Sequence, residues 1–94
     1  MRKSIHTAEY GALCKELRAA REAAGLSQRA LAALLKVPHS WIAKVETGER
    51  RIDLVEFGWF CAACGASPAD EAGAVLSALS ALSAKGPNRS RGRS

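Results

Sequence analysis

The stretch QRALAALLKVPHSWIAKVET, residues 28–47, decides the fold of this chain. Its apolar residues recur at helical spacing on both sides of Val37 and Pro38, and a proline suits the first turn of a helix. Ala32 is small enough for two helices to cross closely there. The stretch therefore predicts two short helices joined by a tight turn. Large apolar residues fill the angle between them (Leu31, Val37, Ile42 and Val45), and the outer face of the second helix is polar (His39, Ser40, Ala43, Lys44 and Thr47).

The residues on either side of this stretch predict two further helices. Residues 10–24 carry apolar side chains at 3.6-residue spacing and stop at Gly25, a residue type that commonly follows a helix. Ser27 is placed to cap the helix that begins the stretch. Asp53 and Glu56, three residues apart, form a capping-box signature for a fourth helix, which we expect to end at Gly65.

Ser67-Pro68, followed by two acids, predicts a fifth helix. Leu76, Leu79 and Leu82 recur every three residues, so on a helix their row drifts by roughly 120° and one flat contact cannot bury all three. We expect an all-α, compact five-helix domain of lambda-repressor-like architecture. Its predicted boundaries are an N-terminal arm (1–6), the domain (7–84, with the helix-turn-helix at 28–47) and a flexible basic tail (85–94).

Composition excludes some classes, and the distribution of charge favours one kind of partner. The chain has 94 residues, a formal net charge of +5 and 48% hydrophobic residues, which excludes disorder along its whole length. Uncharged runs reach only 13 residues, against the roughly 20 that a membrane span needs. Residues 26–52 hold five cations against two acids, whereas residues 53–84 hold four acids and no cation. The paired helices and the loop after them are thus the candidate contact for a polyanion. Charges at Glu9, Lys15 and Glu16 leave no apolar leader, so we expect a cytoplasmic protein.

Three motifs together resemble the lambda-repressor-like, Cro/Xre-type helix-turn-helix family. They are Leu17-Arg18 through Arg21, Gly-Leu-Ser-Gln at 25–28, and Val-Glu-Thr-Gly-Glu-Arg-Arg at 45–51, and the resemblance covers roughly residues 10 to 70. It implies a sequence-specific regulator of transcription that binds double-stranded DNA, bacterial or phage-derived and associated with the nucleoid. The helix at the C-terminal end of the stretch would be the recognition helix in the major groove.

The resemblance also implies roles for individual residues. Base contacts fall on His39, Ser40 and Lys44, and phosphate contacts on Gln28, Arg29, Trp41, Thr47, Arg50 and Arg51. Arg21 and Glu46 occupy the positions of a structural ion pair. Two residues depart from the family pattern: Lys36 stands at a turn position usually held by glycine, and Trp41 stands where a smaller or polar residue is usual. Lys36 must either accept a left-handed conformation or bend the turn differently.

The remaining reactive residues give little support to other chemistry. Cys61 and Cys64 have the CxxC spacing of redox and zinc sites, but only Cys14 could join them and no second such pair exists. Both fall on the inward stripe of the fourth helix, which favours buried small hydrophobes. We expect no metal, no cofactor and no enzymatic activity, because no nucleophile and base have suitable spacing.

A second apolar strip predicts association with another protein chain. It comprises Val55, Trp59, Leu79 and Leu82. We expect a homodimeric repressor on an inverted-repeat operator. The alternative is an antitoxin-like protein that binds a partner protein through Trp59 and the leucines of the fifth helix and regulates its own promoter. An ordinary exposed face is a third interpretation.

Overall fold

The computed structural model describes residues 7–83 and shows five helices in that range. They are α1 (Ala8–Ala23), α2 (Gln28–Leu35), α3 (His39–Thr47), α4 (Leu54–Ala63) and α5 (Pro68–Ser83). No strand occurs among the described residues, so the all-α prediction is confirmed. The predicted arm and basic tail lie outside them. No helix in the described range is long and apolar enough to cross a membrane.

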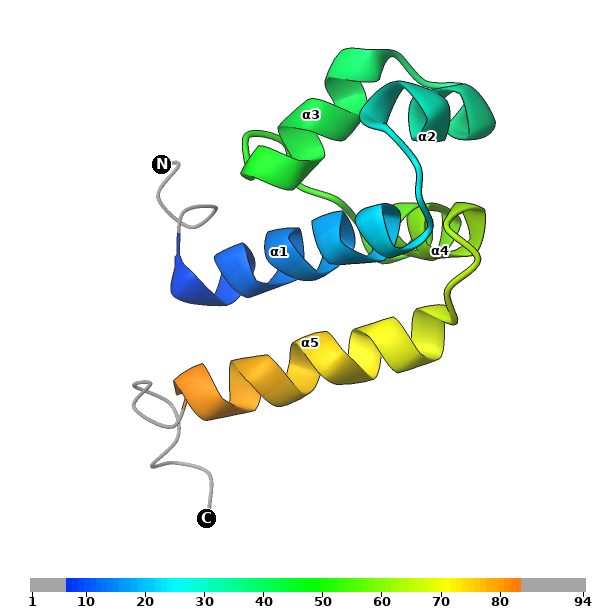
Figure 1. The fold of residues 1–94 in the computed structure, drawn as a ribbon. Helices are drawn as coiled ribbons and strands as arrows, with labels where there is room; N and C mark the ends of the chain where they lie inside the picture. The colour runs from blue at the N-terminus through cyan, green and yellow to red at the C-terminus, as the bar shows by residue number, and fades with distance from the viewer. Residues whose placement is uncertain (1–6, 84–94) are drawn as a thin grey trace.

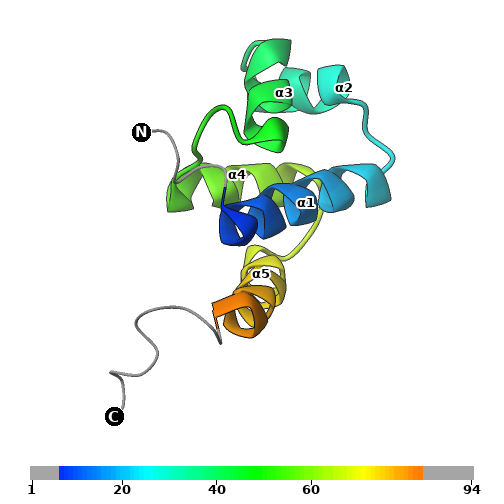
Figure 2. The ribbon, with the colours of Figure 1, turned by 90° about the vertical axis from the view of Figure 1, so that its left-hand side faces the viewer.

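The helices are arranged in three tiers (Figures 1 and 2). α1 and α4 form the middle tier, the α2–α3 pair covers one side, and α5 packs on the opposite side. The core lies where α2 and α3 meet the middle tier, and its fully buried large side chains are Leu17, Leu31, Ile42, Val45, Phe60 and Cys61. This arrangement leaves the outer face of α3 open to solvent at one end of the molecule.

The helix starts follow the capping residues that the sequence contains. Ser27 Oγ accepts a hydrogen bond from the Ala30 amide at 3.0 Å. At α4, Asp53 Oδ1 accepts from the Glu56 amide at 2.8 Å, and Glu56 Oε1 accepts from the Asp53 amide at 3.0 Å. These bonds satisfy amides that would otherwise lack partners in the first turn. The register of α2 and α4 is therefore set locally.

The turn between α2 and α3 is closed by Lys36 in a left-handed conformation, with φ 59° and ψ 44°. Among residues 7–83, Lys36 is the single residue other than glycine that has a positive φ. A side chain at such a position costs about 1–2 kcal/mol. Of the two alternatives that the sequence left open, the structure has the left-handed turn, so the helix-turn-helix keeps its geometry without the usual glycine.

Candidate nucleic-acid interface

α3 separates a buried face from a polar one. Ile42 and Val45 are completely buried against the core. The residues expected to contact bases, His39, Ser40 and Lys44, are all exposed on the other side of the helix. An isolated helix of nine residues would be marginal in water, so packing on α1 and α2 holds this polar face in place.

A buried ion pair fixes α3 to α1. Arg21 Nε donates to Glu46 Oε2 at 2.6 Å, and Arg21 Nη2 donates to Glu46 Oε1 at 3.0 Å. The two side chains are only 9% and 3% exposed. The hydrogen bonds to Glu46 raise the pKa of Arg21 further above its ordinary value, so the guanidinium stays charged. Gln28 Nε2 also donates to Glu46 Oε1, at 3.0 Å, and Arg21 Nη1 donates to the Leu26 carbonyl at 2.8 Å. One carboxylate thus joins α1, α2 and α3.

The residues expected to contact phosphate differ in exposure and in whether their polar groups already bond within the chain. Arg29 is exposed on α2. Gln28 is half-buried beside Glu46, and Thr47 Oγ1 donates to the Lys44 carbonyl at 3.2 Å. Arg51 is exposed, and its guanidinium lies 4.9 Å from the centre of the Tyr10 ring.

Arg50 and Trp41 have partners within the chain. Arg50 Nη1 and Nη2 each donate to the Glu56 carboxylate at 3.2 Å, and Nη1 also donates to the Arg51 carbonyl at 2.8 Å. The same guanidinium lies 4.8 Å from the centre of the Trp41 ring. Trp41 is half-buried and packs against the core cluster. Sequence reasoning assigned Glu56 only to the capping box and missed its contact with Arg50.

Comparison with known proteins agrees with this geometry. A family model described as a helix-turn-helix domain matches residues 12–87. A solved structure, described as an XRE-family like protein from Pseudomonas syringae pv. tomato str. DC3000, has a TM-score of 0.68 and 46% sequence identity. The match covers 85% of this chain and 93% of that chain. This chain belongs to the Cro/Xre-type helix-turn-helix family. No curated protein matches it.

Membership of the Cro/Xre family makes the chain a DNA-binding regulator of transcription. The family is generally not enzymatic. By its place as the second helix of the helix-turn-helix, α3 is the candidate recognition helix of this Cro/Xre-type domain. Residues 28–47 therefore form the candidate nucleic-acid interface.

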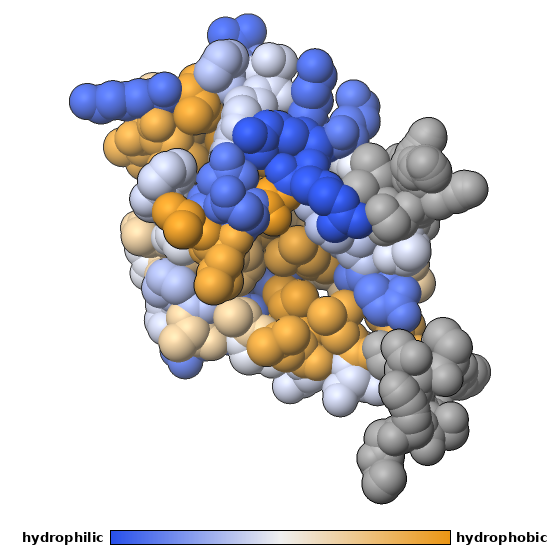
Figure 3. Space-filling view, turned by 180° about the vertical axis from the view of Figure 1, so that it is seen from behind, coloured by the Kyte–Doolittle hydropathy of each residue, from blue (hydrophilic) through white to orange (hydrophobic). Residues whose placement is uncertain are grey.

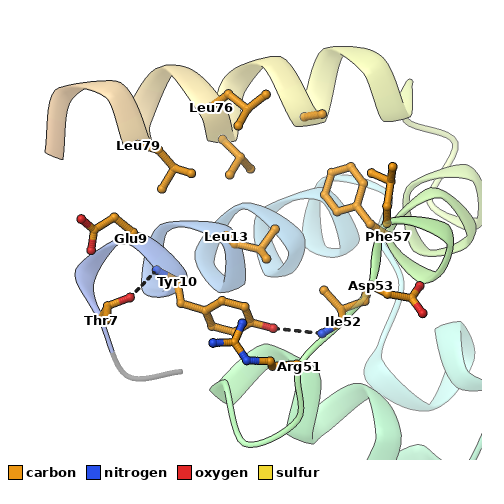
Figure 4. A pocket seen from close by; sticks show the side chains of 13 residues that line it. Thr7, Glu9, Tyr10, Leu13, Arg51, Ile52, Asp53, Phe57, Leu76 and Leu79 are labelled. Carbon is orange, nitrogen blue, oxygen red and sulfur yellow. Dashed lines mark hydrogen bonds between the residues drawn. The ribbon is translucent and has the colours of Figure 1, made fainter. Parts of the chain in front are cut away.

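The Cro/Xre-type domain also has an apolar face, on the side of the molecule seen in Figure 3. Figure 3 shows apolar side chains gathered there over α4 and α5, around a hollow. A groove of about 450 Å³ lies between α1, the start of α4 and α5. Leu13 and Leu79 point into it and Leu76 lies at its edge (Figure 4). Tyr10 and Arg51 also line it, and Tyr10 Oη accepts from the Ile52 amide at 3.0 Å.

The structure does not gather all four residues of the predicted apolar strip in one place. Leu79 lines the groove, whereas Leu82 lines a second groove with Ala8 and Ala12 of α1. Val55 and Trp59 are exposed on α4 and line neither groove. Leu54, which is 80% exposed, was missed. Leu76, which is 61% exposed, was named among the leucines of the fifth helix but not in the strip, and the exposure of both makes them members of an apolar face. Leu54 directly follows the N-cap residue Asp53 and does not belong to the apolar stripe that α4 buries.

The cysteines of the domain are free thiols in or beside the core. Burial raises the pKa of Cys61 to about 11, and burial also raises the pKa of Cys64 and of Cys14. A thiol with a raised pKa is a poor nucleophile and a poor metal ligand. Among residues 7–83, no three metal-ligating side chains come together. The geometry fits the interpretation of these residues as small hydrophobes.

Proposed function

We propose that this protein is a sequence-specific repressor that binds double-stranded DNA as a homodimer on an inverted repeat. The observation that carries the proposal is the exposed polar face of α3, held by the buried contact of Arg21 and Gln28 with Glu46. A reading surface must be rigid for its hydrogen bonds to discriminate bases. Here the bonds that hold α3 lie on its inner side and leave the outer side free to read.

In the proposed complex, His39, Ser40 and Lys44 contact base edges. Lysine reaches O6 and N7 of guanine, and serine serves either base type. Contacts to phosphate come from Gln28, Arg29, Trp41, Thr47 and Arg51, and these set the register without reading sequence. We assign a different role to Arg50, because its guanidinium is held by Glu56 and Trp41.

The proposed dimer uses the apolar face of α4 and α5. Its members are Val55, Trp59 and Leu79 of the predicted strip, together with Leu54 and Leu76. Leu82 is not among them, because it lines the second groove with α1. Charge does not oppose the contact of two such faces: Glu56 is the charged residue of α4, it is paired with Arg50, and α5 carries no charge from Ala72 to Ser83. A two-fold axis would place two recognition helices in successive major grooves, about 34 Å apart.

The proposed action is occlusion of a promoter in the nucleoid of a bacterial cell. The described helices form a DNA-reading domain, and bound at a promoter such a domain excludes other proteins from the same DNA. The antitoxin-like alternative uses the same apolar face for a foreign chain, and no feature of the described residues favours it over a second copy.

Selection of bound duplexes from random DNA, combined with native mass measurement of the complex, tests the proposal. We expect an enriched inverted repeat bound by two chains. With Arg29 and Arg51 of each chain neutralising phosphates, log K of the dimer should fall against log salt with a slope of about −3.6. A flat salt response without enrichment of any sequence would contradict DNA reading, and one chain on each duplex would contradict the dimer.

A further inference from the structure

Arg50 connects the recognition helix to α4 through three consecutive contacts. Its guanidinium faces the Trp41 ring at 4.8 Å and donates twice to Glu56 at 3.2 Å. Glu56 in turn accepts from the Asp53 amide at 3.0 Å, at the start of α4. The main chain adds a fourth contact, because the Arg50 amide donates to the Lys44 carbonyl at 3.1 Å near the end of α3.

This set of contacts joins α3 and α4, two helices whose main packing partners are other helices. α3 packs on α2 and α1, whereas α4 packs on α2, α1 and α5. Trp41 is in the first turn of α3 and Lys44 is one turn later, so Arg50 touches both the ring and the backbone of the recognition helix. The planar guanidinium suits this double role, because it stacks on an aromatic face and binds a carboxylate with two donors at once.

We propose that Arg50 is a positioning residue, which sets the orientation of the recognition helix by clamping Trp41 to the Glu56 carboxylate, and that it is not a phosphate contact. The proposal deepens the proposed function and rests on DNA reading by α3. It identifies Glu56 as part of the DNA-binding machinery although it is an acid on another helix. Electrostatic repulsion alone predicts that an acid near the DNA weakens binding, whereas the proposal predicts that Glu56 strengthens it.

The test compares Glu56→Gln with Glu49→Gln, using a random-sequence duplex and a duplex selected by the wild-type protein as probes. Both changes remove one negative charge from the same region. The structure shows no ion pair between the side chains of Glu49 and Arg50, and the Glu49 carboxylate accepts from the Thr47 hydroxyl at 3.5 Å. Glutamine still serves a capping box, so α4 keeps its start.

If Arg50 contacts phosphate, Glu56→Gln frees the Arg50 guanidinium and DNA binding tightens. If Arg50 positions α3, Glu56→Gln weakens binding to the selected duplex, by roughly fivefold to tenfold for loss of a partly buried ion pair and a cation–π contact.

Salt dependence gives the second comparison. Arg50→Gln should weaken binding of the selected duplex while leaving the salt slope unchanged. Arg29→Gln, the matched change at an exposed arginine of α2, should reduce the slope by about 0.9 per chain. A reduced salt slope for Arg50→Gln would overturn the proposal. So would a Glu56→Gln variant that binds DNA more tightly than the wild type, to the same extent as Glu49→Gln.

Trp41 fluorescence gives a readout that does not depend on DNA. In a Trp59→Phe background, Trp41 is the single tryptophan of the chain. We expect Arg50→Gln and Glu56→Gln to change its emission and Glu49→Gln to leave it unaltered. An unchanged emission in the first two variants would overturn the clamp. If the wild-type protein bound neither duplex, the proposed function would fail, and this emission test would still decide whether the clamp exists.

Discussion

Replacement of Arg21 by methionine leaves the Glu46 carboxylate buried without its cation. The change removes donors at 2.6 and 3.0 Å from that carboxylate and a third donor, at 2.8 Å, from the Leu26 carbonyl. Breaking a buried pair by removing one partner costs about 3–5 kcal/mol. Gln28 still donates to Glu46 at 3.0 Å, so we expect the lower end, about 3 kcal/mol. For a domain of this size that is a fall in Tm of roughly 12 to 24 °C.

Thermal and urea unfolding followed by circular dichroism measure this loss. Arg18→Met is the matched control, since Arg18 pairs with Glu22 at 3.1 Å on the same helix with both side chains more than half exposed. Solvent screens such a pair, so its loss should cost less than about 1 kcal/mol. The double change Arg21→Met with Glu46→Leu should recover most of the stability, because no stranded charge remains. Equal losses in Arg21→Met and Arg18→Met, or a double variant no more stable than Arg21→Met, would refute the reasoning.

Three further outcomes follow from single residues. Lys36→Gly should stabilise the domain by about 1 kcal/mol in urea unfolding, because glycine adopts the left-handed turn without strain; a destabilised variant would show that the turn is not strained. The nearby Glu16 carboxyl and then burial raise the pKa of Glu71, whose Oε1 is buried without a hydrogen-bond partner. Folding thus favours the protonated form of Glu71. The stabilisation that follows is complete below the ordinary glutamate pKa of the unfolded chain, and it is lost as pH rises through the raised pKa of the folded state. Glu71→Gln should therefore flatten the decline in unfolding free energy above about pH 4.3, and an unchanged pH profile would contradict the shift. Lys44→Ala should weaken binding to the selected duplex more than to random DNA, and equal losses would make Lys44 a phosphate contact.

The sequence predicts those parts of the fold that are set by residues close together in the chain. Ser27 and the Asp53–Glu56 box bond to amides three residues away, so their effect on the helix starts needs no tertiary information. The drift of the leucine row on α5 is equally local. Leu76 and Leu79 line one groove and Leu82 lines another, in agreement with a row that drifts by roughly 120° from its first leucine to its last.

The missed features depend on how distant segments meet. Glu56 has a complete local explanation in its capping box, so nothing in its sequence context indicates a contact with Arg50. Tyr10 belongs to the apolar stripe of α1, yet its hydroxyl accepts from the Ile52 amide, 42 residues away. Packing of the helices decides where the Tyr10 hydroxyl bonds and which second partner the Glu56 carboxylate finds. Neither contact can be predicted from the residues nearby in the chain.

The central claim, that the outer face of α3 reads DNA, is tested most directly by amide chemical shifts. A ¹⁵N-labelled sample would be titrated with the duplex selected by the wild-type protein. The account predicts the largest changes at His39, Ser40 and Lys44, with smaller ones at the start of α2. Largest changes along α4 and α5, with the α3 amides unmoved, would contradict it.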